Sequence, residues 1–229
     1  MTRGFLYIVW GDSVEPALQR SLASLRAFHP ELPVEVIRLP AADSMLGLAA
    51  KTTMAARTPF AETLFLDADT VVLDRLDAGF EAAARHGLAC CICENPWAAR
   101  YNGLKSRPDL IEYNTGVLFF TAKAKPVFDA WPRLSRDIDS SMFFLRDGRQ
   151  KRMPYNDQCG FAAAVAEAGI SPFVLPLNWN FRPEFMDVFF GPLKIWHGYE
   201  QVPEELAALN ARYRSGEMPV IQRHSIARA

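Results

Sequence analysis

The sequence predicts an α/β fold in which a mainly parallel central sheet is covered by helices on both faces. Strand-like runs alternate with helical stretches through residues 5–92, as in parallel sheets with helical crossovers. The run at 63–66 is continuously apolar or β-branched, which is typical of a strand buried on both faces. It leads directly into Asp67 and Asp69, and ligands of such sheets bind beyond the carboxyl ends of the strands.

The first half of the chain supplies four predicted strands and three predicted helices. Pro16 favours the start of a helix that carries Leu18, Leu22 and Leu25 on one face. The predicted strands are 5–10, 34–39, 63–66 and 88–92, and the other two helices are 49–56 and 76–85.

The second half is less regular, but its apolar runs still alternate with helical patterns. Strands are predicted at 117–121, 173–175 and 194–196, and helices at 125–134, 157–168 and 204–214. Gly169 is placed to end the helix at 157–168. We expect one domain over residues 1–214, followed by a loose C-terminal tail at 215–229.

Composition restricts how the chain can fold, which partners it can attract, where it is expected and what its cysteines do. The chain has 229 residues, half of them hydrophobic, so it can bury one core without disulfide bonds. Its formal net charge of −1 gives no general field for nucleic acid, and we expect no nucleic-acid partner. No apolar run suits a transmembrane segment or signal peptide, so a cytoplasmic protein is expected. The four cysteines lack the spacing of a zinc site and are expected to be buried thiols.

Asp67 and Asp69 form a candidate cation site. Two like charges about 5 Å apart repel by roughly 3 kcal/mol at an effective dielectric constant of about 20, so a bound diphosphate would need a cation between them. Oxygen ligands suit Mg²⁺ or Mn²⁺, and an added histidine favours Mn²⁺. The same segment also resembles the first motif of haloacid-dehalogenase-type phosphatases, in which Asp67 would be a nucleophile and Asp69 a general acid. Acids after a strand can also simply form turns or cap helices.

Four further polar segments follow these acids. Asn114-Thr115-Gly116 precedes a strand, Asn156-Asp157-Gln158 opens a helix, Trp179-Asn180 follows a strand and His197 ends one. Three of them have an alternative without catalytic function. An acid in the first helical turn is favoured by the helix dipole, Asn114 suits a turn, and a histidine after an apolar strand is often an interior residue.

The order of these segments resembles that of the GT-A glycosyltransferases, most closely family 8, the glycogenin and lipopolysaccharide galactosyltransferase type. The resemblance runs from the first strand to about Gly198 and includes Lys51 upstream of the acids. It implies a GT-A fold and the transfer of a hexose from a nucleotide-diphosphate sugar, with a UDP-hexose as the expected donor and with retention of configuration. The acceptor stays open among a glycan, a lipid-linked sugar, a protein and a small molecule.

The resemblance also implies residue roles. Asp67, Asp69 and His197 would ligate Mn²⁺ or Mg²⁺, which would stabilise the departing nucleoside diphosphate. The residues expected to bind the donor nucleotide are Tyr7, Trp10, Gly11, Asp12, Lys51, Asp67 and Ala68. Those expected at the donor sugar and its reacting face are Asn114, Asp157 and Gln158.

The sequence departs from family 8 after His197. That family carries a Gly-x-x-Lys-Pro-Trp motif whose lysine holds the diphosphate, whereas Gly198-Tyr199-Glu200-Gln201-Val202-Pro203 stands here. Lys194, Arg182 or a residue of the basic tail would have to substitute. A module that binds a nucleotide sugar without turnover is therefore a second hypothesis. The phosphatase hypothesis fits less well, because more than sixty residues precede Asp67 and no late acidic pair follows.

The functions of two further groups of residues are less clearly indicated by the sequence. An aromatic run is expected either to wall an acceptor pocket or to belong to the core. A basic cluster is predicted to be a charged loop that is solvated, attracts an acidic acceptor or closes over the diphosphate. The aromatic run is Trp179, Phe181, Phe185, Phe189 and Phe190, and the basic cluster is Arg146, Arg149, Lys151 and Arg152.

Overall fold

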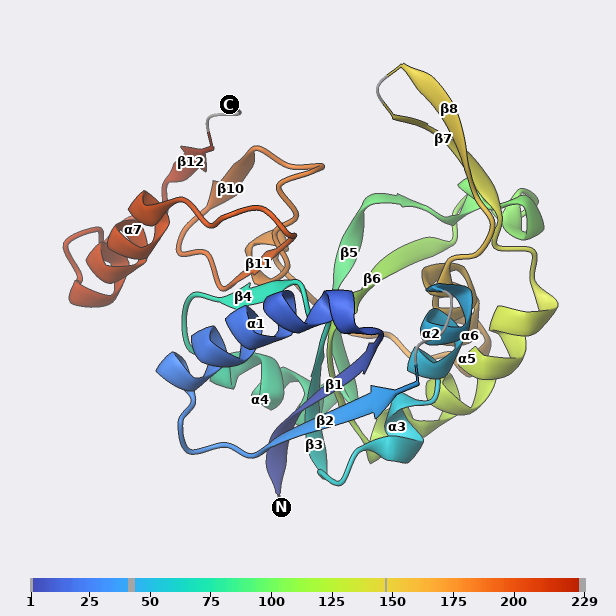
Figure 1. The fold of residues 1–229 in the computed structure, drawn as a ribbon, viewed down its shortest axis with the longest axis horizontal. Coiled ribbons are helices and arrows are strands. Elements are labelled where there is room, and N and C mark those ends of the chain that lie inside the picture. Colours follow the sequence, from blue (N-terminus) through green and yellow to red (C-terminus); the bar gives the residue numbers. More distant parts are fainter. Residues whose placement is uncertain (1, 41–43, 147, 227–229) are drawn as a thin grey trace.

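The computed structural model describes residues 2–40, 44–146 and 148–226, and its centre is a six-stranded sheet in the order β2-β1-β3-β6-β5-β9 (Figure 1). β1 pairs in parallel with β2 and β3, and β5 pairs in parallel with β9, whereas β6 runs antiparallel to both β3 and β5. The mainly parallel sheet predicted from the sequence is confirmed. The strands are β1 Arg3–Trp10, β2 Val34–Leu39, β3 Glu62–Leu66, β5 Leu88–Trp97, β6 Ile111–Thr121 and β9 Phe173–Leu175.

Helices cover both faces of this sheet because side chains alternate along the buried strands. Phe5, Tyr7 and Val9 of β1 pack with α1 and α4 on one face. Leu6 and Ile8 pack with α3, α5 and α6 on the other face. The helices are α1 Glu15–Phe28, α2 Ser44–Lys51, α3 Met54–Arg57, α4 Asp77–His86, α5 Lys125–Asp137, α6 Asp157–Ala168 and α7 Glu204–Ser215. The single helix predicted at 49–56 is therefore divided between α2 and α3.

A smaller lobe at the C-terminal end packs around its own apolar cluster of Phe181, Phe189, Leu193, Trp196 and Leu206 (Figure 1). It contains α7 and two antiparallel strand pairs, β4–β11 and β10–β12. Part of the segment expected to be a loose tail is ordered here, because β12 pairs with β10. The strands are β4 Thr70–Val72, β10 Val188–Phe190, β11 Ile195–His197 and β12 Arg223–Ser225.

The basic cluster does not lie in a loop. β7 Met142–Arg146 and β8 Arg149–Met153 form an antiparallel hairpin of their own, so the prediction of a charged loop is wrong. Cross-strand pairing makes this basic sequence a strand, although its composition does not indicate one.

Other predictions concern burial. All four cysteines are buried and free, and burial raises the pKa of Cys93 and of Cys159 to about 12. In the aromatic run, Trp179, Phe181 and Phe189 are buried, whereas Phe185 and Phe190 are exposed. Among the described residues, no helix combines the length and the apolar character needed to cross a bilayer.

Candidate functional site

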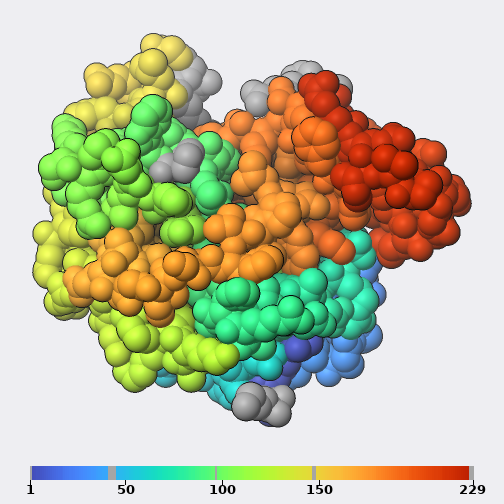
Figure 2. Space-filling view, turned by 180° about the vertical axis from the view of Figure 1, so that it is seen from behind, coloured from blue at the N-terminus to red at the C-terminus, as the bar shows by residue number. Residues whose placement is uncertain are grey.

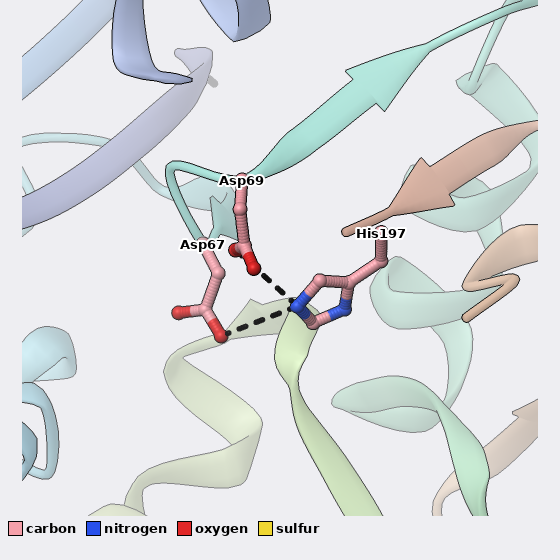
Figure 3. A group of neighbouring side chains, drawn as sticks. All are labelled: Asp67, Asp69 and His197. Carbon is pink, nitrogen blue, oxygen red and sulfur yellow. Dashed lines mark ion pairs between the residues drawn. The ribbon is translucent and has the colours of Figure 1, made fainter. Parts of the chain in front are cut away.

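Asp67, Asp69 and His197 meet at the carboxyl end of β3 (Figure 3). Asp67 directly follows β3 and Asp69 directly precedes β4, while His197 ends β11. Because β4 pairs with β11 and places His197 opposite Thr70, Asp69 and His197 become neighbours although they are 128 positions apart in the chain. The Gly198 amide donates to the Asp69 carbonyl at 2.9 Å and fixes this approach.

The three side chains suit a hard divalent cation. His197 Nε2 lies 3.4 Å from Asp69 Oδ1 and 3.8 Å from Asp67 Oδ2, and one ligand atom from each residue lies within 4.8 Å of the others. Adjacent ligands about 2.1 Å from an octahedral ion lie about 3 Å apart, so small side-chain movements would let these three atoms occupy neighbouring coordination positions. Two carboxylates and one imidazole match the preferences of Mn²⁺ and, less closely, Mg²⁺.

Gly116 lets β6 approach these side chains. Its carbonyl accepts a hydrogen bond of 2.8 Å from the Asp67 amide. A Cβ atom at this position would lie 2.3 Å from His197 Cε1 and 2.6 Å from Asp67 Oδ2. The Asn-x-Gly segment therefore needs glycine for space.

Lys51 supplies a buried positive charge beneath the acids. Its Nζ lies 2.9 Å from Asp67 Oδ1 and 3.5 Å from Asp157 Oδ2, and Thr115 Oγ1 donates to the same Asp157 oxygen at 2.7 Å. Burial alone would lower the pKa of Lys51, but the charges of Asp157 and Asp67 outweigh it and the pKa is raised. Lys51 is therefore a structural cation of the site rather than a solvated surface lysine.

The two acids of the pair differ in their electrostatics. Burial raises the pKa of Asp67 despite the charges of Lys51 and His197. Burial is the largest single influence on Asp69 and opposes its ionisation, but the hydrogen bond and charge of His197, a backbone hydrogen bond and the charge of Lys51 together lower the pKa of Asp69.

A directed chain of buried hydrogen bonds holds His197. Asn180 Nδ2 donates to Asn114 Oδ1 at 2.8 Å, so the Asn180 Oδ1 that faces His197 Nδ1 at 2.8 Å is left to accept. This assignment makes Nδ1 the donor to Asn180 and leaves Nε2 as the ring nitrogen that faces the acids, where its lone pair would be available to a bound cation. Asn114 Nδ2 in turn donates to Gln158 Oε1 at 3.0 Å, and Gln158 Nε2 donates to Glu112 at 2.7 Å.

Glu112 ends this chain in the interior. Its Oε1 accepts from Arg100 at 2.5 Å and from Tyr101 at 2.6 Å, and its side chain is fully buried. Sequence reasoning assigned no role to Glu112, Thr115 or the Asn180 side chain. The sequence could have indicated the role of Glu112, because it is spaced by two from Asn114 and by four from Gly116, and residues at such spacing share one face of a strand.

A pocket of ≈ 460 Å³ opens beside the acids and falls within the size range of small-molecule sites. Three residues predicted to bind the donor nucleotide line it, namely Trp10, Asp67 and Ala68, together with Tyr199. Gly11 and Asp12 form the turn after Trp10 but are not among its lining residues. Tyr7 lies in the core, where its hydroxyl pairs with Ser21, and burial raises its pKa.

A second pocket brings Arg182 to the other side of the acids. Arg182 lines it together with Asp69 and His197, while its guanidinium lies 3.2 Å from Glu94. Lys194, another predicted replacement for the missing phosphate lysine, instead pairs with Asp74 at 3.0 Å and lines neither pocket.

Three of the solved structures whose fold is similar to that of this chain are glycosyltransferases. Mouse xyloside xylosyltransferase 1 in its apo form gives a TM-score of 0.59 at 14% identity, with 89% of this chain and 100% of that chain covered. Galactosyltransferase LgtC, in complex with donor and acceptor sugar analogs, gives 0.52 at 15% identity, with 93% and 94% covered. GlyE of Streptococcus pneumoniae TIGR4 gives 0.56 at 12% identity, with 95% and 64% covered. No protein-family model and no curated protein matches the sequence.

The chain has the GT-A fold. The fold implied by the sequence resemblance is thus confirmed, and LgtC is itself a family 8 member. At identities of 12–15% the likeness concerns the fold, so an activity has to be argued from the side chains at the site.

Proposed function

We propose that this GT-A chain is a metal-dependent glycosyltransferase that transfers a hexose from a nucleotide-diphosphate sugar, with a UDP-hexose as donor and Mn²⁺ as the ion. The observation that carries the proposal is the meeting of Asp67, Asp69 and His197 at the edge of a pocket large enough for a nucleotide. A bound cation at these three residues would bridge the diphosphate and stabilise its developing negative charge.

The remaining side chains have roles that follow from their positions. Trp10 offers an aromatic wall for the base, and Lys51 holds Asp67 in place from below. Arg182 is the cation that we assign to the diphosphate in place of the missing lysine, because it shares a pocket with Asp69 and His197.

Retention of configuration is also part of the proposal. An inverting transfer requires a free base to accept the proton of the acceptor hydroxyl. Asp157 is buried and held by Lys51 and Thr115, which suits it to position the donor sugar and not to act as a mobile base. Asn114 and Gln158 flank the same region and would bind sugar hydroxyls.

Calorimetric titration with UDP, GDP and CMP, each with Mn²⁺ and again with EDTA, tests the site. We expect UDP to bind only with Mn²⁺, and we expect Asp69→Ala and His197→Ala to abolish this binding and the hydrolysis of UDP-hexoses. Asp129→Ala is the control, because that carboxylate is exposed and, among the described residues, forms its ion pair with Lys125. Binding of no nucleotide, or unchanged activity in both site variants, would reject the proposal. Proton NMR of the product then reports retention or inversion.

A matched pair of variants tests the diphosphate cation. Arg182→Gln is expected to raise the dissociation constant for UDP by roughly tenfold, since a charge-assisted contact contributes about 1.5 kcal/mol or more. Lys194→Gln removes an equally partnered cation outside both pockets and is expected to leave UDP binding unchanged. The opposite pattern would move the assignment to Lys194.

A further inference from the structure

The β7–β8 hairpin stands out from the body of the molecule as a two-stranded projection (Figures 1 and 2). Its register assigns each side chain to one of two faces, because cross-strand partners share a face. Met142 pairs with Met153 and Phe144 with Lys151 on the first face. Phe143 pairs with Arg152 and Leu145 with Gln150 on the second.

The first face accounts for the attachment of the hairpin to the body. Met142 belongs to the buried cluster that includes Tyr101 and Leu104, and Phe144 and Met153 pack against that cluster. A hairpin with one covered face is expected to carry polar side chains on the other face.

The second face does not follow that rule. Phe143 and Leu145 lie on this second face, and they are large apolar side chains that are 59% and 77% exposed. The adjoining segment adds Trp97, which is 62% exposed and directly precedes Ala98 of the same buried cluster. Large apolar side chains gathered on a projection indicate a surface that is covered by a partner.

Charge indicates the chemistry of that partner. Residues 142–153 contain four basic residues and one acid, whereas the chain as a whole has a formal net charge of −1. Three of the basic side chains of the hairpin are exposed, namely Arg149, Lys151 and Arg152. The neighbouring segment, whose Asn102 donates a hydrogen bond to Ser141 at the base of the hairpin, adds the exposed Lys105 and Arg107. Asp109 and Asp139 are exposed in the same region, and Asp139 interacts with Arg152 and Lys105, so five exposed basic side chains face two exposed acids and the local surface is positive although the whole chain is near neutral.

We propose that the β7–β8 hairpin docks this protein on an anionic lipid surface. Phe143 and Leu145 enter the boundary between headgroups and acyl chains, and Arg152, which pairs with Phe143 on the same face, contacts the anionic headgroups. Arg149 and Lys151 belong to the first face, and their long, exposed side chains add to the attraction through the local positive charge. Interfacial binding combines these two terms, apolar burial and attraction to anionic lipid. A soluble polyanion would use the charges but would leave Phe143 and Leu145 in water. The proposal does not depend on the proposed transferase activity.

Flotation of the full chain with vesicles tests the proposal. The vesicles are phosphatidylcholine alone, or an equal mixture with phosphatidylglycerol, at low and at high salt. We expect binding to the anionic vesicles only and its loss at high salt, because exposed charges are screened. Lys151→Gln with Arg152→Gln should weaken partitioning about thirty-fold, and Phe143→Ser with Leu145→Ser about tenfold or more.

Matched controls lie elsewhere on the surface. Phe173→Ser removes an apolar side chain that is 41% exposed, and Arg57→Gln removes an exposed basic one, and both should float as the wild type does. Leu145→Ser alone is the variant least able to disturb the fold, and thermal unfolding checks each protein. Equal flotation with both vesicles, or hairpin variants that float like the wild type, would overturn the proposal. Heparin binding that survives Phe143→Ser with Leu145→Ser, without flotation, would assign the surface to a polyanion instead.

Discussion

Gly116→Ala tests the geometry of the metal site most directly, because the three atoms nearest to the added methyl group all belong to His197 and Asp67. The methyl carbon would lie 2.3 Å from His197 Cε1, whereas ordinary contact begins at 3.4 Å, so the ring would have to move by the difference of 1.1 Å. A ligand bond of about 2.1 Å does not survive such a shift. We expect the affinity for Mn²⁺ to fall by about a hundredfold or more, and the free energy of unfolding to fall by about 1–3 kcal/mol from overpacking.

Two measurements separate these effects. The signal of free Mn²⁺ in electron paramagnetic resonance gives the affinity, and urea unfolding in EDTA gives the stability. The control is Gly169→Ala, where φ is +63° and no atom lies within 4 Å of the added methyl, so about 1–2 kcal/mol of backbone strain is expected without an effect on the metal. If Gly116→Ala bound Mn²⁺ as tightly as Gly169→Ala does, the proposed ligand geometry would be refuted.

Three further predictions follow from buried polar groups. Asn180→Ala removes the acceptor for His197 Nδ1 and should weaken Mn²⁺ binding about 10–100-fold with little change in fold, as measured by the same resonance titration and by circular dichroism. Lys51→Met leaves the buried carboxylate of Asp157 and the partly buried one of Asp67 without their lysine, and should cost about 3–5 kcal/mol of unfolding free energy in EDTA and less with Mn²⁺, as measured by urea unfolding. Lys125→Met at an exposed ion pair should cost under about 1 kcal/mol. His29 is buried, its Nε2 accepts from the Leu76 amide, and burial lowers its pKa below 6.5. The unfolded chain therefore binds more protons than the folded one, so the free energy of unfolding should fall as the pH drops below about 6.5. His29→Gln should flatten this dependence in urea unfolding measured across that pH range.

Local signals in the sequence were sufficient where an element depends on its own residues. The helix predicted at 157–168 has those limits, since the Asn156 side chain accepts from the Gln158 amide at its start and Gly169 adopts the left-handed conformation at its end. The strand predicted at 34–39 likewise matches β2. The polar segments at Asn114, Asn180 and His197 were identified because each borders an apolar strand, and the segment at Asn156 because it opens a helix.

Elements that depend on distant partners were not predictable in this way. β6 begins at Ile111, six residues before the predicted start, because Glu112 and Asn114 bond to side chains of other elements instead of forming a turn. β8 is a strand only by virtue of its pairing with β7. Tyr7 was placed at the nucleotide from its position in β1, but alternation along the strand points it into the core towards Ser21.

The structure also separates the two functions that the acids alone left open. In the phosphatase hypothesis Asp69 is a general acid and has to hold a proton near neutral pH, which requires a raised pKa. Burial would raise it, but the hydrogen bond and charge of His197, a backbone hydrogen bond and the charge of Lys51 together lower the pKa of Asp69, so that the group stays an anion. His197 in turn has its Nδ1 proton committed to Asn180, and its Nε2 faces both acids. Asp67, Asp69 and His197 thus present two carboxylates and one imidazole nitrogen that could hold a cation, and an Asp69 that stays an anion argues against the general acid that the phosphatase hypothesis requires.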